Sequence, residues 1–324
     1  MGAAGGAVVD VLGAELAGRD LAAVGRGHTA CGRAWGGLRC RCGQSVRGVV
    51  GVGGLAARTG ATSGSKRPAA AGARPGDGIC RDDRRRDAPG GHQPVARWPL
   101  TGRPVLSLVT ARGRLDATRQ DVIATLFEQV RAAVAAGVDL IQVREPDLSD
   151  QVLLAIVTRC VDLARGSKTV ILVNDRLDIA LVAGAGGTHL RAHSVPAPVA
   201  RRHVPTGFLL GRSVHDVAEA VRVVEGGGLD YLVLGTVFSS HSKPGVLPCG
   251  VRVLGAVARA VDLPVLAIGG VTVDNSVEVF RAGAAGVAAI GLFAEPGPSG
   301  RFEGVPRIVG GLRRSYTESD VQRG

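Results

Sequence analysis

A polar and charged cluster stands at the end of an apolar run, where a buried strand would normally give way to turn residues. The run VDLI (138–141) leads into Gln142, Arg144 and Glu145, and Pro146 follows. The planar guanidinium of an arginine binds carboxylates and phosphates through two parallel hydrogen bonds. The cluster therefore predicts an anionic ligand near Arg144.

Similar clusters follow four other apolar runs. Their members are Asn174 and Asp175, then His193 and Ser194, then Ser213 and His215, and finally Thr236, Ser239, Ser240, His241, Ser242 and Lys243. Each cluster alone has an ordinary explanation, such as turn chemistry or a satisfied polar side chain. Together they predict one functional mouth in which a histidine could transfer a proton near neutral pH.

Two further apolar runs end in glycine. AIGGVT contains Gly269 and Gly270, and AAIGLF contains Ile290 and Gly291. Glycine has no Cβ, so its backbone N–H group can approach a phosphate oxygen closely. These segments predict a phosphorylated ligand, although Gly269 and Gly270 could instead only form a tight turn.

Short apolar runs alternate with longer helical patterns from residue 104 onward. The expected strands are 105–110, 140–145, 170–175, 188–191, 208–213, 231–235, 264–270 and 286–293. The expected helices, in which apolar residues recur every three or four positions, include 121–137, 151–166, 217–227, 250–261 and 275–286. Apolar strands that alternate with helices are typical of a parallel sheet covered on both faces.

Eight such units over about 200 residues predict an α/β fold of the (β/α)8 TIM-barrel type. A doubly wound open sheet is the alternative. In a TIM barrel the reactive side chains lie at the C-terminal ends of the strands, and the loops after the last two strands often bind phosphate. The barrel would span residues 101–300, and residues 301–324 would form a C-terminal extension.

Residues 1–100 differ in composition from the rest of the chain. They hold 15 basic and 7 acidic side chains, a net charge of +8, whereas the other residues hold 24 and 21, a net charge of +3. A segment so rich in Gly, Ala and Arg buries too little apolar surface to offset the entropy lost on ordering. We expect a disordered tail, or one that an over-extended start codon adds to the native protein. Because the basic excess lies there, composition gives no support to nucleic-acid binding.

The sequence also predicts where the protein works. Asp10 and Glu15 interrupt the apolar N-terminal residues, which argues against a secretory signal. No run approaches the roughly 18 apolar residues of a membrane helix. We therefore expect a cytoplasmic protein with unpaired cysteines, among which Cys160 and Cys249 would only pack.

Five segments, in their order and spacing, resemble the thiamine phosphate synthase/TenI family. They are QVRE (142–145), ILVNDRLDIALVAGAGGTHL (171–190), LLGRSVH (209–215), DYLVLGTVFSSHSKPG (230–245) and PVLAIGGVTVDN (264–275). The resemblance covers about residues 104–295 and implies a TIM barrel that could form a homodimer. By resemblance, synthases join a pyrimidine diphosphate to thiazole phosphate with Mg²⁺, whereas TenI-type tautomerases aromatise carboxythiazole phosphate by moving a proton.

Two positions depart from the synthase pattern that the resemblance supplies. The lysine that would bind diphosphate after the second strand is Pro146 here, and the second magnesium-binding aspartate is Ser194, although the first is present as Asp175. A neutral hydroxyl is a poor substitute for a carboxylate on Mg²⁺. The resemblance therefore favours a thiazole tautomerase that needs no cofactor and takes a phosphorylated thiazole as its substrate.

The same resemblance assigns the site residues. GRSVH resembles the segment with the catalytic histidine of the tautomerases, so His215 would transfer the proton. Synthases often have a histidine there too, so His215 indicates the family better than the activity. His193 is a weaker candidate. Arg144 or Lys243 would offset the substrate carboxylate. The expected substrate-binding residues are Gln142, Asn174, Ser213, Thr236, Ser240, Ser242, Gly269, Gly270, Ile290 and Gly291.

Three alternatives stay open. The chain could be a weakened synthase in which Asp175 binds Mg²⁺ together with water molecules. It could be a barrel without catalysis that binds a phosphorylated ligand or serves regulation. The fold alone would also allow a phosphate-sugar isomerase. In each case we expect a small-molecule partner, and neither nucleic acid nor a membrane.

Overall fold

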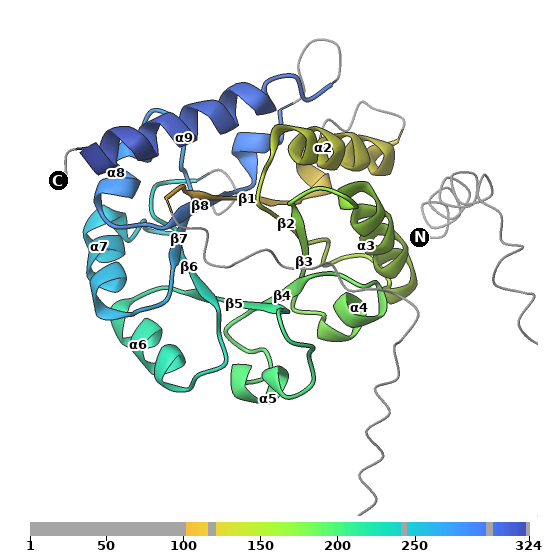
Figure 1. Ribbon diagram of the computed structural model, residues 1–324, viewed down its shortest axis with the longest axis horizontal. Helices are drawn as coiled ribbons and strands as arrows, with labels where there is room; N and C mark the ends of the chain where they lie inside the picture. The colour runs from red at the N-terminus through yellow and green to blue at the C-terminus, as the bar shows by residue number, and fades with distance from the viewer. Residues whose placement is uncertain (1–101, 116–120, 241–244, 296–300, 322–324) are drawn as a thin grey trace, which may run out of the picture. The chain divides into compact units, whose positions relative to one another are not determined.

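The computed structural model describes residues 102–115, 121–240, 245–295 and 301–321. Within these residues eight parallel strands close into one barrel in chain order, and β1 pairs with β8 (Figure 1). The strands are β1 (Val105–Val109), β2 (Leu140–Val143), β3 (Val170–Asn174), β4 (Gly187–Leu190), β5 (Leu209–Val214), β6 (Tyr231–Gly235), β7 (Val265–Ile268) and β8 (Gly286–Ala289). The predicted TIM barrel is confirmed and the open sheet is wrong. The predicted tail, 1–100, lies outside the described residues.

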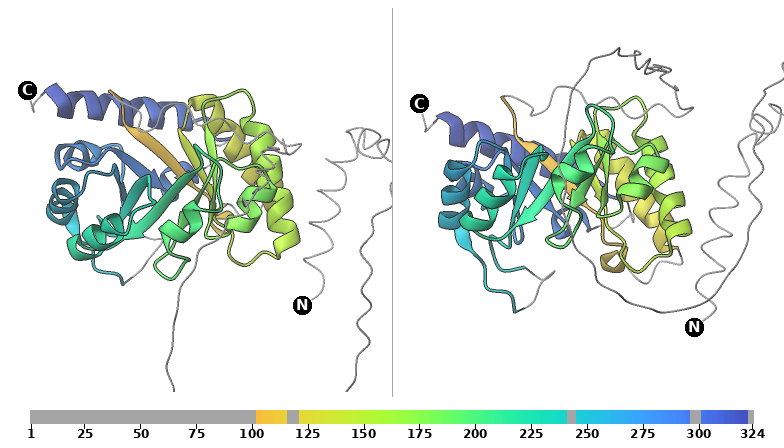
Figure 2. Two further views of the ribbon diagram at one scale, coloured as in Figure 1. Left: turned by 60° about the horizontal axis from the view of Figure 1, so that its bottom comes forward. Right: turned by 90° about the horizontal axis from the view of Figure 1, so that it is seen from below.

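Helices surround the barrel as an outer ring (Figures 1 and 2). They are α2 (Val122–Ala136), α3 (Asp150–Ala164), α4 (Leu177–Val182), α5 (Ala197–Arg201), α6 (Val217–Glu225), α7 (Gly250–Ala260), α8 (Ser276–Arg281) and α9 (Val305–Val321). Two 3₁₀ helices, η2 (Arg112–Arg114) and η3 (Gly291–Phe293), follow β1 and β8. Helix α9 packs beside α8 and α2, so the ring uses a helix from the segment predicted as a C-terminal extension.

Local capping explains where several helices begin and end. The Asp121 carboxylate accepts hydrogen bonds of 2.9 Å from the first backbone N–H groups of α2, and Gly137, with φ of 77°, ends that helix. Ser149 and Asp216 cap α3 and α6 in the same way. Such caps satisfy backbone donors that the helix itself leaves unpaired.

Alternation along each strand gives two apolar layers. On β1, Val105 and Val109 belong to the cluster inside the barrel, whereas Leu106 and Leu108 belong to the cluster between the strands and the helices. This two-residue period follows from strand geometry, in which successive side chains point to opposite faces. The same alternation decides which polar residues near the mouth point inward.

Some predicted strands run too far at their C-terminal ends. The structure ends β2 at Val143, β7 at Ile268 and β8 at Ala289, rather than at residues 145, 270 and 293. Gly269 and Gly270 have φ of 98° and 64°, outside the extended region, so they cannot continue a strand. The predicted strands therefore included the first residues of the functional loops.

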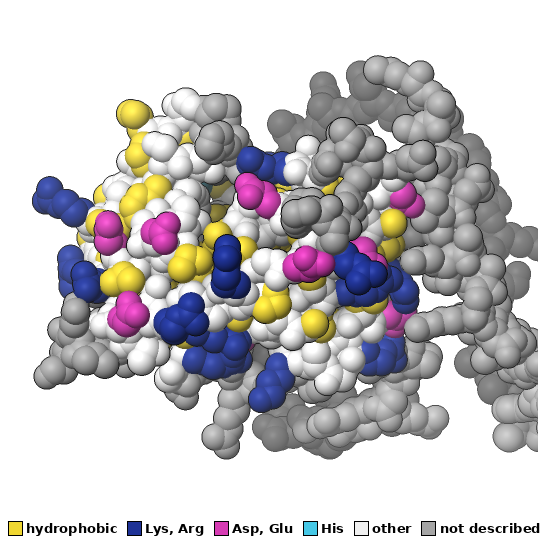
Figure 3. Space-filling view, turned by 90° about the horizontal axis from the view of Figure 1, so that it is seen from above, with side chains coloured by type: hydrophobic (Ala, Val, Ile, Leu, Met, Phe, Trp, Pro, Cys, Tyr) yellow, Lys and Arg dark blue, Asp and Glu magenta, His cyan; other side chains and the backbone are white. Residues whose placement is uncertain are grey.

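Two features of the described residues concern the hydropathy of the helices and the charge of the surface. In the described part of the chain, no helix is long and apolar enough to cross a membrane. Figure 3 shows the side of the barrel that carries α9 and α2, where basic and acidic side chains are interspersed over the described residues.

Candidate active site

The polar residues at the C-terminal end of β2 have different roles. Gln142 is buried in the barrel and donates from Nε2 to Asn174 Oδ1 at 3.1 Å, so it joins β2 to β3. Arg144 is exposed, and only its backbone N–H is fixed, by Thr110 Oγ1 at 3.0 Å. Pro146 is also exposed. Among the described residues the Arg144 guanidinium has no partner, which leaves it available for an anion.

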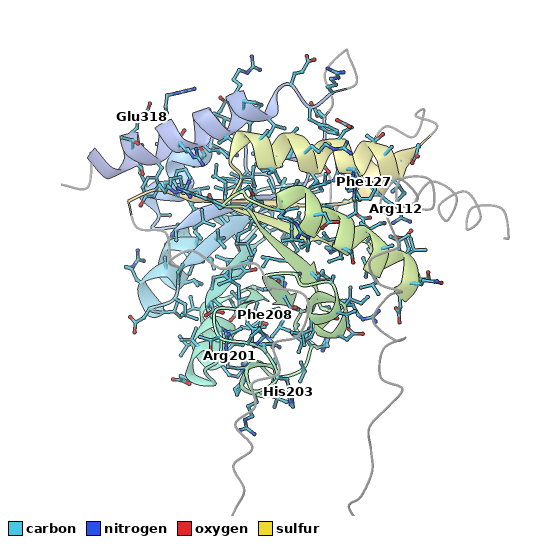
Figure 4. All side chains as sticks on the ribbon, turned by 45° about the vertical axis from the view of Figure 1, so that its right-hand side comes forward. Arg112, Phe127, Arg201, His203, Phe208 and Glu318 are labelled. Atoms are coloured by element: carbon cyan, nitrogen blue, oxygen red, sulfur yellow. The ribbon has the colours of Figure 1, made fainter. Side chains whose placement is uncertain are left out.

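Glu145 serves the structure rather than a ligand. Its buried carboxylate accepts hydrogen bonds from Thr110 Oγ1 at 2.7 Å and from the backbone and guanidinium of Arg112 at 3.1 Å. Arg112, which is labelled in Figure 4, also donates a hydrogen bond to Asp147 at 2.6 Å. The hydrogen bond and charge of Asp147 raise the pKa of the Arg112 guanidinium. This network holds the loop after β1 against the loop after β2.

Asp175 stands directly after β3 in a strained backbone conformation. Its φ is 65°, and it is the one non-glycine residue with positive φ among the described residues. Its carboxylate accepts a hydrogen bond from the Ser194 hydroxyl and lies 3.8 Å from an Arg191 nitrogen. Ser194 in turn accepts from the Arg191 backbone N–H at 2.6 Å. Residues in this backbone region often belong to functional sites.

The oxygen atoms of Asp175 and Ser194 do not form a good magnesium site. Mg²⁺ is bound through oxygen ligands, usually with one or two carboxylates and several waters. Here the Asp175 carboxylate already meets a hydroxyl and a guanidinium, and the cation of Arg191 repels a second cation.

His215 and Glu219 form a pair just beyond β5. His215 Nδ1 lies 3.0 Å from Glu219 Oε2, and the same oxygen accepts from the His215 backbone N–H at 2.9 Å. A carboxylate only accepts, so this contact places the ring proton on Nδ1 and leaves Nε2 for a ligand. The His215 side chain is 54% exposed, so a ligand can reach it. His193 is exposed on the loop after β4.

A cavity of about 530 Å³ opens between the loops after β6, β7 and β8. It brings together six of the predicted substrate-binding residues: Thr236, Ser240, Gly269, Gly270, Ile290 and Gly291. Arg114 of η2 and Glu295 also line it, and the sequence reasoning missed both. Arg114 stands two residues beyond another arginine after the first strand, a polar strand end that the sequence reasoning did not include.

The glycines that line this cavity differ in how much space surrounds them. A Cβ on Gly270 would lie 2.4 Å from the Ser239 carbonyl oxygen, and one on Gly269 would lie 2.6 Å from Thr236 Cγ2. The turn itself therefore requires both glycines. A Cβ on Gly291 would meet nothing within 4 Å, so its place beside the cavity is not dictated by packing.

The predicted residues do not all share this cavity. Gln142, Arg144, Asn174, Asp175, Ser213 and His215 stand at the ends of β2, β3 and β5, and none of them lines it. Ser242 and Lys243 lie outside the described residues. The mouth thus has a glycine-lined side at β6–β8 and a polar side at β2–β5.

The sequence reasoning also missed His189 on β4. It is buried, with Nε2 at 2.8 Å from Ser213 Oγ and Nδ1 at 3.2 Å from the Tyr231 hydroxyl. Burial lowers the pKa of His189 to about 4, helped by the nearby charge of Arg212. Its place within the expected strand 188–191 concealed it, although the two-residue alternation could have identified it as inward-facing.

Comparison with known proteins identifies the family. The family profile described as thiamine monophosphate synthase, TMP-TENI, matches residues 115–293, more than half of the chain. The chain belongs to this family. The resemblance predicted from the five segments is therefore confirmed.

Individual relatives agree with this assignment. The thiamine-phosphate synthase of Methanoculleus marisnigri is 43% identical over 167 residues, which cover 51% of this chain and 79% of that protein. That of Roseiflexus castenholzii is 38% identical over 191 residues, which cover 59% and 81%. A solved structure, the thiamine phosphate pyrophosphorylase from Pyrococcus furiosus, has a TM-score of 0.55 at 28% identity and covers 66% of this chain and 96% of that one. These names support the synthase alternative rather than the tautomerase.

Proposed function

We propose that the protein is an enzyme of thiamine biosynthesis that acts on a phosphorylated thiazole, and that it aromatises carboxythiazole phosphate by proton transfer. The contact between Ser194 and Asp175 is the observation that favours the tautomerase over the synthase. Where the synthase pattern has a second carboxylate for Mg²⁺, this chain has a hydroxyl that binds the first carboxylate. Pro146 removes a cation from the same side of the mouth. Both departures affect diphosphate and metal, and neither affects thiazole phosphate.

The two sides of the mouth bind different groups of this substrate. The substrate phosphate enters the cavity at β6–β8, where the Gly269–Gly270 turn and Gly291 allow close approach of the backbone. The exposed guanidinium of Arg144 meets the substrate carboxylate from the other side. His215 Nε2 takes the proton from one ring carbon and returns a proton to another, while Glu219 stabilises the imidazolium that forms between these steps.

Thiamine-phosphate synthase is the second candidate, and the names of the relatives favour it. The synthase reaction would use Gln142, Arg144, Asn174 and Ser213, which lie at the ends of β2, β3 and β5. This reaction would require Asp175 to exchange its contact with Ser194 for Mg²⁺ and to complete the metal's coordination with water. It would also require a replacement for the cation that Pro146 removes.

The test is aromatisation of carboxythiazole phosphate in the presence of a chelator of divalent cations. We expect full turnover, because no step of the proposed reaction uses a metal. Loss of turnover with the chelator, restored by added Mg²⁺, would contradict the metal-free reaction. Absence of aromatisation under both conditions would remove the tautomerase.

A further inference from the structure

Three polar side chains form a chain of hydrogen bonds inside the barrel. Tyr231 of β6 belongs to the apolar cluster of the barrel interior, and its hydroxyl lies 3.2 Å from His189 Nδ1. On the other side of the imidazole, Nε2 lies 2.8 Å from Ser213 Oγ, near the mouth end of β5. This chain connects the interior of the barrel with the site.

The backbone of β5 leaves room for the rings of His189 and Tyr231 to meet. Gly211 lies between His189 and Tyr231 in the register of β4, β5 and β6. A Cβ on Gly211 would lie 2.0 Å from Tyr231 Cζ, so a larger residue would displace the tyrosine ring from the histidine. Tyr231 and His189 are 2% and 3% exposed, so water does not compete for their hydrogen bonds.

Burial fixes the charge states of both rings. It lowers the pKa of His189 to about 4 and raises that of Tyr231, so both are neutral at physiological pH. A neutral imidazole has one N–H donor and one acceptor nitrogen. The bonds to Tyr231 and to Ser213 are therefore coupled. When the tyrosine hydroxyl donates to Nδ1, Nε2–H donates to Ser213 Oγ.

The hydrogen bonds through Tyr231, His189 and Ser213 can run in either direction, and a bound ligand selects one of them. An oxyanion at Ser213 only accepts hydrogen bonds, so the serine hydroxyl must donate to it. The serine oxygen is then free to accept from His189 Nε2–H, and Nδ1 accepts from Tyr231. We propose that His189, held by Tyr231, is a positioning residue that orients the Ser213 hydroxyl as a donor to an oxyanion of the ligand. This inference rests on the proposed function.

That oxyanion is distinct from the phosphate at the glycine loops. Ser213 is on β5, whereas Gly269, Gly270 and Gly291 follow β7 and β8, and β6 stands between them. In the tautomerase the second oxyanion is the substrate carboxylate. In a synthase the same position would receive the diphosphate. The chemistry that the serine recognises is shared, so the experiment must separate the two sources.

The experiment measures binding to the full-length protein by calorimetry. The ligands are thiazole phosphate, its carboxylated form, and inorganic diphosphate with Mg²⁺. The variants are Ser213→Ala and Tyr231→Phe, which removes a hydroxyl and keeps the ring beside Gly211. Tyr316→Phe is the matched control, because Tyr316 packs against Phe280 on the outer helices.

Loss of one hydrogen bond of this kind should weaken binding about three- to tenfold. We expect this loss in Ser213→Ala and in Tyr231→Phe for the carboxylated thiazole, and no loss for thiazole phosphate or in Tyr316→Phe. The combined variant should lose little more than either single one, because both act on one hydrogen bond. A loss for diphosphate alone would assign the oxyanion to the synthase and still support His189 as a positioning residue.

Two results would overturn the inference in different ways. If the wild-type protein binds the ligands and both variants bind them equally well, the chain of hydrogen bonds does not position Ser213, while the proposed function stands. If the wild-type protein binds none of them, the proposed function fails and the inference fails with it. Nitrogen NMR of the wild-type complex gives an independent reading, since a proton on His189 Nδ1 rather than Nε2 would also overturn it.

Discussion

His189 and His215 stand near the ends of neighbouring strands, yet their surroundings give them different chemistry. His189 is buried and neutral, so it can orient a neighbour but cannot gain a proton readily. His215 is half-exposed beside a carboxylate, which suits the proton transfer that we propose for it. Of the two, the sequence singled out only His215, because its match to the GRSVH segment was visible while burial was not.

The neutral state of His189 predicts how stability depends on pH. Its pKa is about 4 in the folded protein and 6.5 for an unperturbed histidine, so the unfolded chain binds more protons between these values. The free energy of unfolding should therefore fall as pH falls through this range, by about 2 kcal/mol between pH 7 and pH 5 from this residue alone.

Urea unfolding at pH 7 and pH 5 measures this change. His189→Gln should reduce the difference between the two pH values, whereas His203→Gln, at an exposed position, should keep it. An unchanged difference in His189→Gln would show that the buried imidazole does not cause it.

The pair of His215 and Glu219 predicts a specific kinetic pattern. His215→Gln should fold normally and lose most turnover. Glu219→Gln should lower kcat about tenfold with little change in KM, because a neutral amide stabilises the imidazolium less than a carboxylate does. Steady-state kinetics of aromatisation measure both effects, and Glu278→Gln, at an exposed position of α8, is the matched control. Retained activity in His215→Gln would remove this residue from proton transfer.

At the scale of elements, the turn between β7 and α8 combines a left-handed backbone conformation with a place in the cavity. Gly270 has φ of 64°, and an added Cβ would lie 2.4 Å from the Ser239 carbonyl oxygen. We expect Gly270→Ala to lower the free energy of unfolding by about 2 kcal/mol and to weaken thiazole phosphate binding. Gly291→Ala should keep the free energy of unfolding within about 0.5 kcal/mol, because nothing lies near its added methyl group.

Thermal unfolding of both variants, with calorimetric binding of thiazole phosphate, checks this difference. If Gly270→Ala unfolded like the wild-type protein, the turn would not need its glycine. The prediction that Gly270→Ala weakens thiazole phosphate binding would then have no structural reason.

The elements themselves were largely predictable because their signals are local. Apolar runs gave all eight strands, and helical periodicity gave helices such as α2, α3 and α7. It did not give α9, although that helix has 17 residues. The short helices α4 and α5 were not singled out, since six and five residues barely exceed one helical turn. The ends of β2, β7 and β8 were misplaced because polar residues and glycines there look like strand continuations in sequence.

At the scale of the whole molecule, closure of the barrel decides which strand ends meet. The sequence predicted a common mouth from the fold, and the structure gathers Thr236, Gly269 and Gly291 from three different loops around one cavity. It could not predict that Glu145 would join the loop after β1, or that His189 would bridge β5 and β6. Those contacts depend on spatial neighbours that lie far apart in the chain.

Residues 1–100 should be dispensable for the barrel's chemistry. The family profile begins at residue 115, and most of the net charge precedes residue 101. A variant that lacks residues 1–100 should unfold within a few degrees of the full-length protein and keep its kcat. Comparison of the two proteins by thermal unfolding and aromatisation kinetics checks this. A large loss of activity in the shortened protein would assign a role to the N-terminal segment.

We propose that this barrel moves a proton on a thiazole and does not join two substrates. The most direct measurement compares two reactions of the full-length protein. One mixture contains carboxythiazole phosphate alone, and the other contains hydroxymethylpyrimidine diphosphate, thiazole phosphate and Mg²⁺. We predict aromatised product in the first mixture and no thiamine phosphate in the second. Thiamine phosphate in the second mixture, with no aromatisation in the first, would contradict the account and make the protein a synthase despite Pro146 and Ser194.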